Sequence, residues 1–196
     1  MTPRTFIMIG RSGCGKGTQA DLLLAYLKEK TGMEGYHLET GKKFREFIKT
    51  EGYTADLARE IINTGRLQPE FLAIWNWTSS VIENLKPDMN LVIDGAPRKL
   101  FEAEVLNLAL EFYKRENPVV LFLNVSENWA RERLMARQRG DDKLEGINRR
   151  LAWYETEVLP VVEFFKKKKS YGFLEINGEQ SIEKVQADIL SGLKLK

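Results

Sequence analysis

The sequence is poor in the residues on which several classes of protein depend. Cysteine and histidine occur once each, as Cys14 and His37, so an internal disulfide or a cysteine-based zinc cluster is excluded. The first apolar run, residues 6–9, is too short for a signal peptide and far too short to span a bilayer. Positive charge shows no excess, with 30 Lys+Arg against 28 Asp+Glu, whereas nucleic-acid-binding surfaces are usually basic. We therefore expect a cytoplasmic protein that binds neither membranes nor nucleic acid.

What the chain does contain is an alternation of short apolar runs and helical patterns. Its 196 residues, 43% of them hydrophobic and 30% charged, suit a single globular domain with a buried core. Strands are predicted at residues 6–9, 91–93, 119–123 and 173–176, and helices at 18–30, 71–84, 101–116, 128–137, 146–168 and 182–193. The sequence predicts an α/β fold in which a doubly wound parallel sheet carries helices on both faces.

The strongest functional signal is the glycine-rich run GRSGCGKGT at residues 10–18. It follows a predicted strand and precedes a predicted helix, the context in which backbone N–H groups converge on phosphate oxygens. The glycines allow backbone angles and close approaches that side chains would block. Lys16 supplies a point charge for the β- and γ-phosphates, and Thr18 supplies the hydroxyl. We predict nucleotide binding by the loop residues Gly13, Cys14, Gly15, Lys16, Gly17 and Thr18.

Arginines recur in several separate segments. Phosphoryl transfer requires two nucleotides held in line, their charges neutralised and water excluded. The guanidinium fork matches phosphate oxygens in a bidentate way, so converging arginines are what such chemistry needs. The candidates are Arg45, Arg98, Arg137, Arg139 and Arg150.

Several motifs together resemble one family. The form GKGTQ at residues 15–19 is similar to that of adenylate kinases and their nucleoside monophosphate kinase relatives. Further matches are ETGKKFR at 39–45, GRLQ at 65–68, IDGAPR at 93–98 and the arginine-rich stretch at 133–154. They occur in the family's order and run nearly end to end. The chain therefore resembles the adenylate kinase family in a short-lid form, with a P-loop NTPase fold.

The resemblance implies transfer of the γ-phosphate of ATP to AMP, giving two ADP, by a monomer that uses Mg²⁺. It implies catalytic roles for Lys16, Arg98, Arg137, Arg139 and Arg150. On the ATP side it adds Arg133, stacked on adenine, Arg137, and Gln180 in a loop near the base. On the AMP side it implies Thr40, Gly41, Arg45, Arg66, Leu67, Gln68, Gly95, Ala96, Pro97, Arg98, Glu102, Arg139 and Arg150. Asp94 would orient Mg²⁺ through water.

The resemblance also divides the chain into a core and two small inserts. The core would comprise residues 1–39, 69–136 and 150–196, the insert that binds the monophosphate residues 40–68, and the lid residues 137–149. The lid is short, since only Gln138 separates Arg137 from Arg139, and it has no cysteine or histidine for zinc. The four tryptophans are interpreted as packing residues, and His37 as a structural one.

Glu102 departs from the family pattern, in which a glutamine stands four residues after the arginine at 98. An amide both donates and accepts, whereas an ionised carboxylate only accepts. A carboxylate suits guanine, with its two donors, better than adenine, while Thr40 is typical of members that use AMP. AMP is the favoured substrate. A kinase for GMP or for UMP and CMP stays open as an alternative, as does a non-catalytic nucleotide-binding protein.

Overall fold

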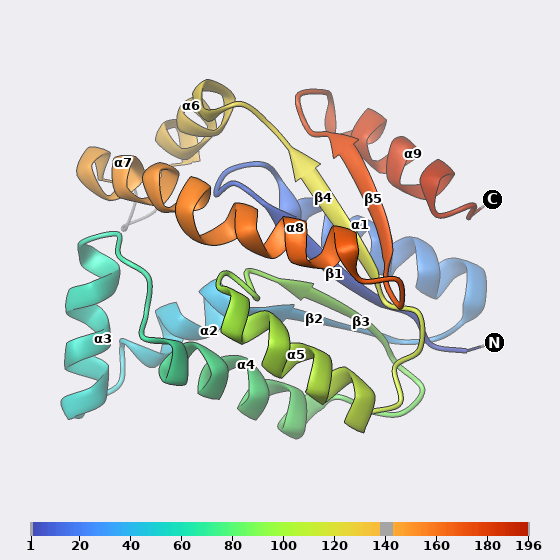
Figure 1. Cartoon of the computed structure of the whole chain (residues 1–196), viewed down its shortest axis with the longest axis horizontal. Helices are drawn as coiled ribbons and strands as arrows, with labels where there is room; N and C mark the ends of the chain where they lie inside the picture. Colours follow the sequence, from blue (N-terminus) through green and yellow to red (C-terminus); the bar gives the residue numbers. More distant parts are fainter. Residues whose placement is uncertain (1, 138–142, 196) are drawn as a thin grey trace.

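The fold is built on one parallel sheet. A computed structural model of the chain describes residues 2–137 and 143–195. The five strands of its sheet are β1 (Thr5–Gly10), β2 (Gly35–Glu39), β3 (Asn90–Asp94), β4 (Val119–Asn124) and β5 (Gly172–Asn177), in the spatial order β2-β3-β1-β4-β5. All neighbouring strands are parallel. The predicted fold class is confirmed (Figure 1).

Helices connect the strands and cover both faces of the sheet. They are α1 (Lys16–Thr31), α2 (Thr40–Phe47), α3 (Tyr53–Asn63), α4 (Glu70–Asn84), α5 (Leu100–Phe112), α6 (Glu127–Arg137), α7 (Leu144–Trp153), α8 (Leu159–Lys167) and α9 (Ile182–Gly192). Among these described residues, no helix combines the length and apolarity needed to cross a bilayer.

The sheet separates two apolar clusters because successive side chains of a strand point to opposite faces. In β1, Ile7 and Ile9 belong to the cluster that packs against α4, α5 and α8. Phe6 and Met8 belong to the other cluster, which packs against α1, α9 and parts of α6 and α7. The fully apolar strands predicted from the sequence are therefore buried between two helical layers.

Two local features differ from the predicted elements. The edge strand β2 was not predicted, because its residues GYHLE contain only one fully buried apolar side chain, Leu38. The single helix predicted at 146–168 is divided by a π-helical turn, Tyr154–Val158, where Leu159 N–H bonds to the carbonyl of Tyr154. Pro160 follows in the first turn of α8. Proline has no N–H and cannot occupy a regular helix interior, which accounts for the break.

The carboxyl ends of the strands point to the left and upper left in Figure 1, where α2, α3, α6 and α7 extend beyond the sheet. In open parallel sheets, ligands bind outside these strand ends. The fold therefore directs attention to this end of the molecule.

Candidate active site

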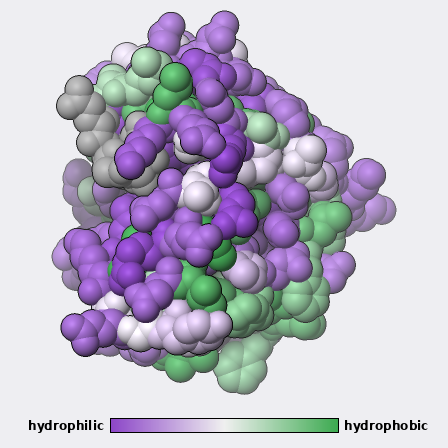
Figure 2. Space-filling view, turned by 90° about the vertical axis from the view of Figure 1, so that its left-hand side faces the viewer, coloured by the Kyte–Doolittle hydropathy of each residue, from purple (hydrophilic) through white to green (hydrophobic). Residues whose placement is uncertain are grey.

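One cavity of about 550 Å³ lies at the carboxyl ends of the strands. Figure 2 views this end of the molecule and shows that hydrophilic residues cover most of it. Most of the residues predicted for the site line this cavity: Gly13, Gly15, Lys16, Gly17, Thr18, Thr40, Gly41, Arg45, Arg66, Leu67, Gln68, Asp94, Gly95, Ala96, Arg98, Glu102, Arg133, Arg137 and Arg150. Residues from distant parts of the sequence thus share one wall.

The glycine-rich run is a loop between β1 and α1 with a constrained backbone. Gly13 has a φ of +88°, and a Cβ atom there would lie 2.8 Å from the carbonyl oxygen of Ala130. Gly15, with a φ of +96°, is the N-cap residue of α1. The first N–H groups of a helix have no partner within the helix, so they are available to an anion. Loop and helix together have the backbone geometry of a phosphate cradle.

Lys16 is the first residue of α1 and lies over the loop. Its Nζ donates hydrogen bonds to the carbonyl oxygens of Gly10 and Arg11, both at 2.9 Å. The ammonium group is also 3.6 Å from the Sγ of Cys14. The charge is therefore held at the mouth of the loop, where phosphate oxygens would replace or supplement the carbonyl contacts.

Asp94 is a buried carboxylate beside the start of α1. Asp94 is the last residue of β3, and a Cβ atom at Gly17 would lie 3.4 Å from its Oδ2. Burial raises the pKa of Asp94, and nearby Lys16 and His37 oppose that rise. His37 lies between two acids, with Nδ1 2.8 Å from Asp21 and Nε2 3.9 Å from Asp94. These contacts are compatible with the structural role predicted for the histidine.

Six of the described arginines line the cavity: Arg45, Arg66, Arg98, Arg133, Arg137 and Arg150. Arg45 donates to Glu39 at 2.8 Å, and the guanidinium of Arg133 lies 4.7 Å from the ring centroid of Trp129. Such a concentration of positive charge is unfavourable without a counter-charge, because like charges repel. Polyphosphate is the anion that guanidinium groups match best in geometry.

Arg98 is the most enclosed member of this group. Its Nε donates to the carbonyl of Gly95 at 2.8 Å, and its guanidinium carbon lies 5.5 Å from the ring centroid of Trp153. Burial lowers the pKa of Arg98, the nearby acids Glu102 and Asp94 oppose that change, and the charges of Arg150 and Arg45 add to it. A bound phosphate would relieve this repulsion, so the site favours an anion at this place.

The cavity wall also contains the buried residues Glu102, Gln68 and Trp77. Glu102 is in the first turn of α5 and is only 4% exposed. Gln68 donates from Nε2 to the carbonyl of Ala58, while its Oε1 is buried without a hydrogen-bond partner in the part of the chain that the structure describes. The Nε1 of Trp77 is likewise buried without a hydrogen-bond partner among the described residues. Unused polar atoms beside apolar surface are suited to a nucleobase.

The sequence matches the family model described as "Adenylate kinase" over residues 8–170. The chain belongs to the adenylate kinase family. An adenylate kinase of Bacteroides thetaiotaomicron is 32% identical over 187 residues, covering 93% of this chain and 94% of the relative. One of Phocaeicola vulgatus is 30% identical over 192 residues, covering 96% and 97%. One of Oenococcus oeni is 28% identical over 180 residues, covering 91% and 93%.

Membership of the adenylate kinase family confirms the resemblance inferred from the motifs. The chain is a nucleoside monophosphate kinase, as predicted, and the non-catalytic alternative is not favoured. The identity of individual site residues stays a prediction, supported by the geometry described above.

Three predicted site residues do not line the cavity, and a fourth lies outside the residues that the structure describes. Cys14 is buried in the core, and its backbone N–H donates to the carbonyl of Arg11. Pro97 follows a cis peptide bond and is buried behind the wall. Gln180 donates to Asn177 and to Asp188. Arg139 lies outside the residues that the structure describes.

The cavity wall also contains residues that were not predicted from the sequence to belong to the site. They are Ser12, Asp21, Glu39, Phe44, Ile62, Gly65, Ala73, Trp77 and Trp153. A spacing rule could have found some of them, since residues three or four apart share a helix face. Trp153 follows Arg150 by three, and Phe44 follows Thr40 by four. The others depend on tertiary packing.

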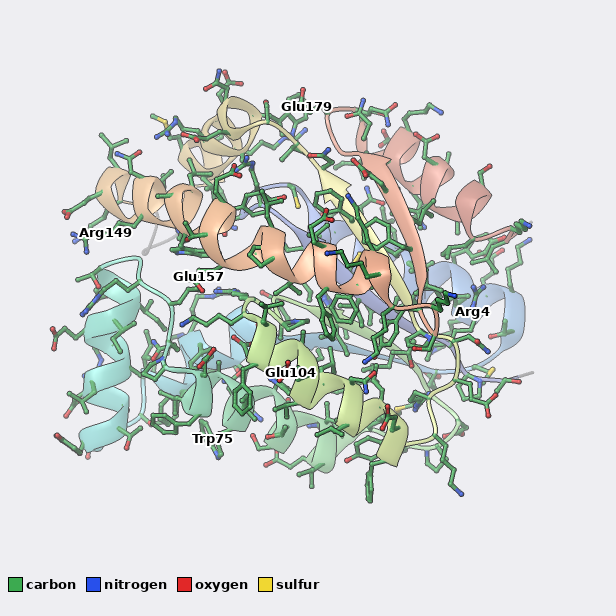
Figure 3. The ribbon with its side chains drawn as sticks, in the orientation of Figure 1. Arg4, Trp75, Glu104, Arg149, Glu157 and Glu179 are labelled. Atoms are coloured by element: carbon green, nitrogen blue, oxygen red, sulfur yellow. The ribbon has the colours of Figure 1, made fainter. Side chains whose placement is uncertain are left out.

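The segment after α3 contacts α7 directly. Arg149 Nη1 donates to the carbonyl of Thr64 at 3.1 Å, and Trp153 Nε1 donates to that of Gly65 at 3.2 Å. The backbones of Gly65 and Gly146 approach so closely that a Cβ at Gly65 would lie 2.6 Å from the Cα of Gly146. Figure 3 shows Arg149 on the side of α7 that faces α3. These contacts close one side of the cavity.

Glu102→Gln is expected to stabilise the nucleotide-free enzyme at high pH but not at low pH. Burial raises the pKa of Glu102 from 4.5 to about 7, against the opposing effect of Arg98. The folded protein therefore retains a proton that the unfolded chain loses, and stability falls as the pH rises through this window. Between pH 5 and pH 8, we expect the stabilisation of the variant over the wild type to grow by about 2 kcal/mol.

Urea unfolding at the two pH values measures this difference. Glu104→Gln, an exposed position on the same helix (Figure 3), is the matched control and should show no comparable pH dependence. Equal stabilisation of the Glu102 variant at both pH values would contradict a raised pKa in the folded state.

Proposed function

We propose that this enzyme transfers the γ-phosphate of ATP reversibly to AMP, giving two ADP. The observation that carries the proposal is the convergence of the P-loop and six arginines on a single cavity. A protein that only binds ATP needs one phosphate site. Arg45 and Arg98 line the same cavity and would supply the second phosphate site that transfer requires. Family membership supports the same reaction.

The proposed mechanism relies on positioning and charge neutralisation. Lys16, Thr18 and the loop N–H groups bind the phosphates of ATP, and Arg45 and Arg98 bind the phosphate of AMP. Arg137, Arg139 and Arg150 neutralise the phosphoryl group in transfer. Phosphoryl transfer needs little covalent help, so holding both nucleotides in line accounts for most of the rate. Arg133 and Gln180 keep their predicted place beside the base of ATP.

We also propose the division into a core, a monophosphate-binding insert at 40–68 and a short lid at 137–149. The contact between Thr64 and Arg149 supports it, because it joins the end of the first segment to the last residue of the second. Such segments commonly open to release product and close to exclude water. Cytoplasmic location and a monomeric state stay predictions from the sequence.

The residues present fit Mg²⁺ bound mainly by nucleotide. Among the described residues, no group of three or more His, Cys, Asp or Glu side chains could hold a metal ion by itself. Mg²⁺ keeps several waters and is usually held by one or two carboxylates together with substrate phosphates. Asp94, buried beside Gly17, provides such a carboxylate. When bound, the ion would neutralise charge on the transferring phosphates.

We expect phosphorylation of AMP by Mg-ATP to exceed that of GMP, CMP and UMP at pH 7. Thr40 supports AMP, since it lines the cavity with its hydroxyl anchored on the carbonyl of Asp94 at 3.2 Å. The measurement is ADP formation with each monophosphate in turn, with a sample lacking Mg²⁺ as the control. Activity with UMP or CMP but none with AMP would overturn the proposed substrate. Absence of transfer to any monophosphate would overturn the reaction itself.

A further inference from the structure

Glu102 has an unusual combination of place and chemistry. It is nine-tenths or more buried, and it lines the cavity, as Gln68 and Trp77 do. A buried carboxylate normally has a salt-bridge partner, because an isolated charge is costly to remove from water. No side-chain ion pair of Glu102 occurs among the described residues at 4.0 Å or less. Its position therefore favours the uncharged acid.

Few charges act on Glu102. On its own segment these are Arg98 and Lys99, and the backbone N–H of Arg98 also donates to the carboxyl group. From α4, which packs against α5, the acting group is the carboxylate of Glu70. Arg45 and Arg150, also in the cavity wall, act on Arg98. Burial and the charge of Glu70 raise the pKa of Glu102, whereas Arg98 and Lys99 lower it. Because burial is the largest of these effects, the pKa lies in the neutral range.

The two forms of the group have different hydrogen-bonding patterns. A protonated carboxyl has one donor and one carbonyl acceptor side by side, as a glutamine amide has. It can donate to N1 of adenine and accept from the N6 amino group. An ionised carboxylate presents two acceptors, which match the N1–H and N2–H donors of guanine. Its acceptance of the Arg98 N–H is possible in both forms, since each oxygen has two lone pairs.

We propose that Glu102 selects the purine of the monophosphate through its own protonation, pairing with adenine when neutral and with guanine when ionised. The inference rests on the proposed function and assigns the specificity of that same site. One enzyme would then change its preferred acceptor with pH. The mismatched base would leave a buried polar group unpaired, which is the situation in which a binding site discriminates strongly.

The test is the ratio of kcat/KM for AMP to kcat/KM for GMP, measured from pH 6 to pH 8 with saturating Mg-ATP. Ionisations of ATP and of the monophosphate phosphate affect both substrates alike and cancel in the ratio. At saturating Mg-ATP, kcat/KM for the monophosphate reports ionisations of the enzyme–Mg-ATP complex. A group that keeps its pKa of about 7 in that complex should lower the ratio about 100-fold across this range. In Glu102→Gln the ratio should favour AMP and vary less than about threefold. Glu104→Gln should follow the wild type.

Calorimetry supplies an independent readout that a purely structural role would not change. At pH 8, AMP binding to the wild type should take up close to one proton, observed by repeating the titration in buffers of different ionisation enthalpy. GMP binding at the same pH should take up none, and neither should AMP binding to Glu102→Gln. Both monophosphates are fully ionised at this pH, so the phosphate does not contribute.

The outcomes separate the inference from the function on which it rests. Phosphorylation of AMP with a pH-independent ratio, or an unchanged profile in Glu102→Gln, would overturn the role of Glu102 and leave the kinase assignment standing. Failure of the wild type to phosphorylate either purine monophosphate would overturn both. Parallel changes in the ratio and in proton uptake would support the inference.

Discussion

Lys16→Met is expected to lower kcat about 10³-fold, which corresponds to roughly 4 kcal/mol of lost transition-state stabilisation. Methionine has a similar length but no charge and no donors. Lys16 begins α1 at the mouth of the glycine loop, where its Nζ already donates to two backbone carbonyls. The charge is therefore preorganised at the place where negative charge accumulates on the transferring phosphoryl group. Initial rates with Mg-ATP and AMP measure the effect.

The matched control is Lys28→Met, on the same helix. Lys28 is exposed and pairs with Glu34 at 2.7 Å, away from the cavity. Its kcat should stay within about twofold of the wild type, as for other surface changes. Unfolding curves of both variants show whether a loss of activity has a structural cause. Normal turnover of the Lys16 variant would mean that the loop is not the catalytic phosphate site.

Arg98→Lys is expected to lower kcat/KM for the monophosphate about 10²-fold while changing KM for ATP little. Lysine retains the positive charge, so the variant isolates the geometry of the guanidinium. That group is fixed by the carbonyl of Gly95 on one side and by the ring of Trp153 on the other. An ammonium group cannot maintain both contacts and bind a phosphate through two parallel donors.

Measuring KM for AMP and KM for ATP in the same variant shows which of the two nucleotides Arg98 binds. Arg131→Lys is the control, because Arg131 is on α6, outside the cavity wall, and its guanidinium binds Glu127 and Asn148. It should retain nearly full activity. A rise in KM for ATP, with an unchanged KM for AMP, would assign Arg98 to the other nucleotide.

The sequence was a good guide wherever the physical requirement is local. The glycine-rich loop needs particular residues next to one another, so its glycines, its lysine and the flanking strand and helix could be predicted together. Strands β3 and β4 were equally clear, because burial on both faces requires continuous apolar runs. Strand β2 was not, since an edge strand can be largely polar. The π-helical turn before Pro160 escaped a pattern based on regular helices.

The candidate site also contains residues that could be predicted from the sequence and residues that only the tertiary structure reveals. Arginines could be proposed individually from motifs, and the cavity places Arg45, Arg98 and Arg150 in one wall. Trp77 and Trp153 are packing residues, as predicted, since Trp77 belongs to a core cluster and Trp153 packs against it. Both also line that wall, and Trp153 lies against Arg98. The face that a tryptophan presents depends on the helix orientation, and that is decided by contacts between elements. The contact of Thr64 with Arg149 joins segments 85 residues apart and has no local signature.

Glu102 illustrates the boundary most clearly. The sequence alone determined that a carboxyl group replaces an amide four residues after Arg98, and hydrogen-bonding rules then raised the question of which base it accepts. Only the tertiary structure decided how that carboxyl ionises. Burial in the first turn of α5 raises its pKa to about 7, more than the nearby Arg98 lowers it. Residue identity is a property of the chain, whereas the cost of holding a charge depends on how much water the fold removes around it.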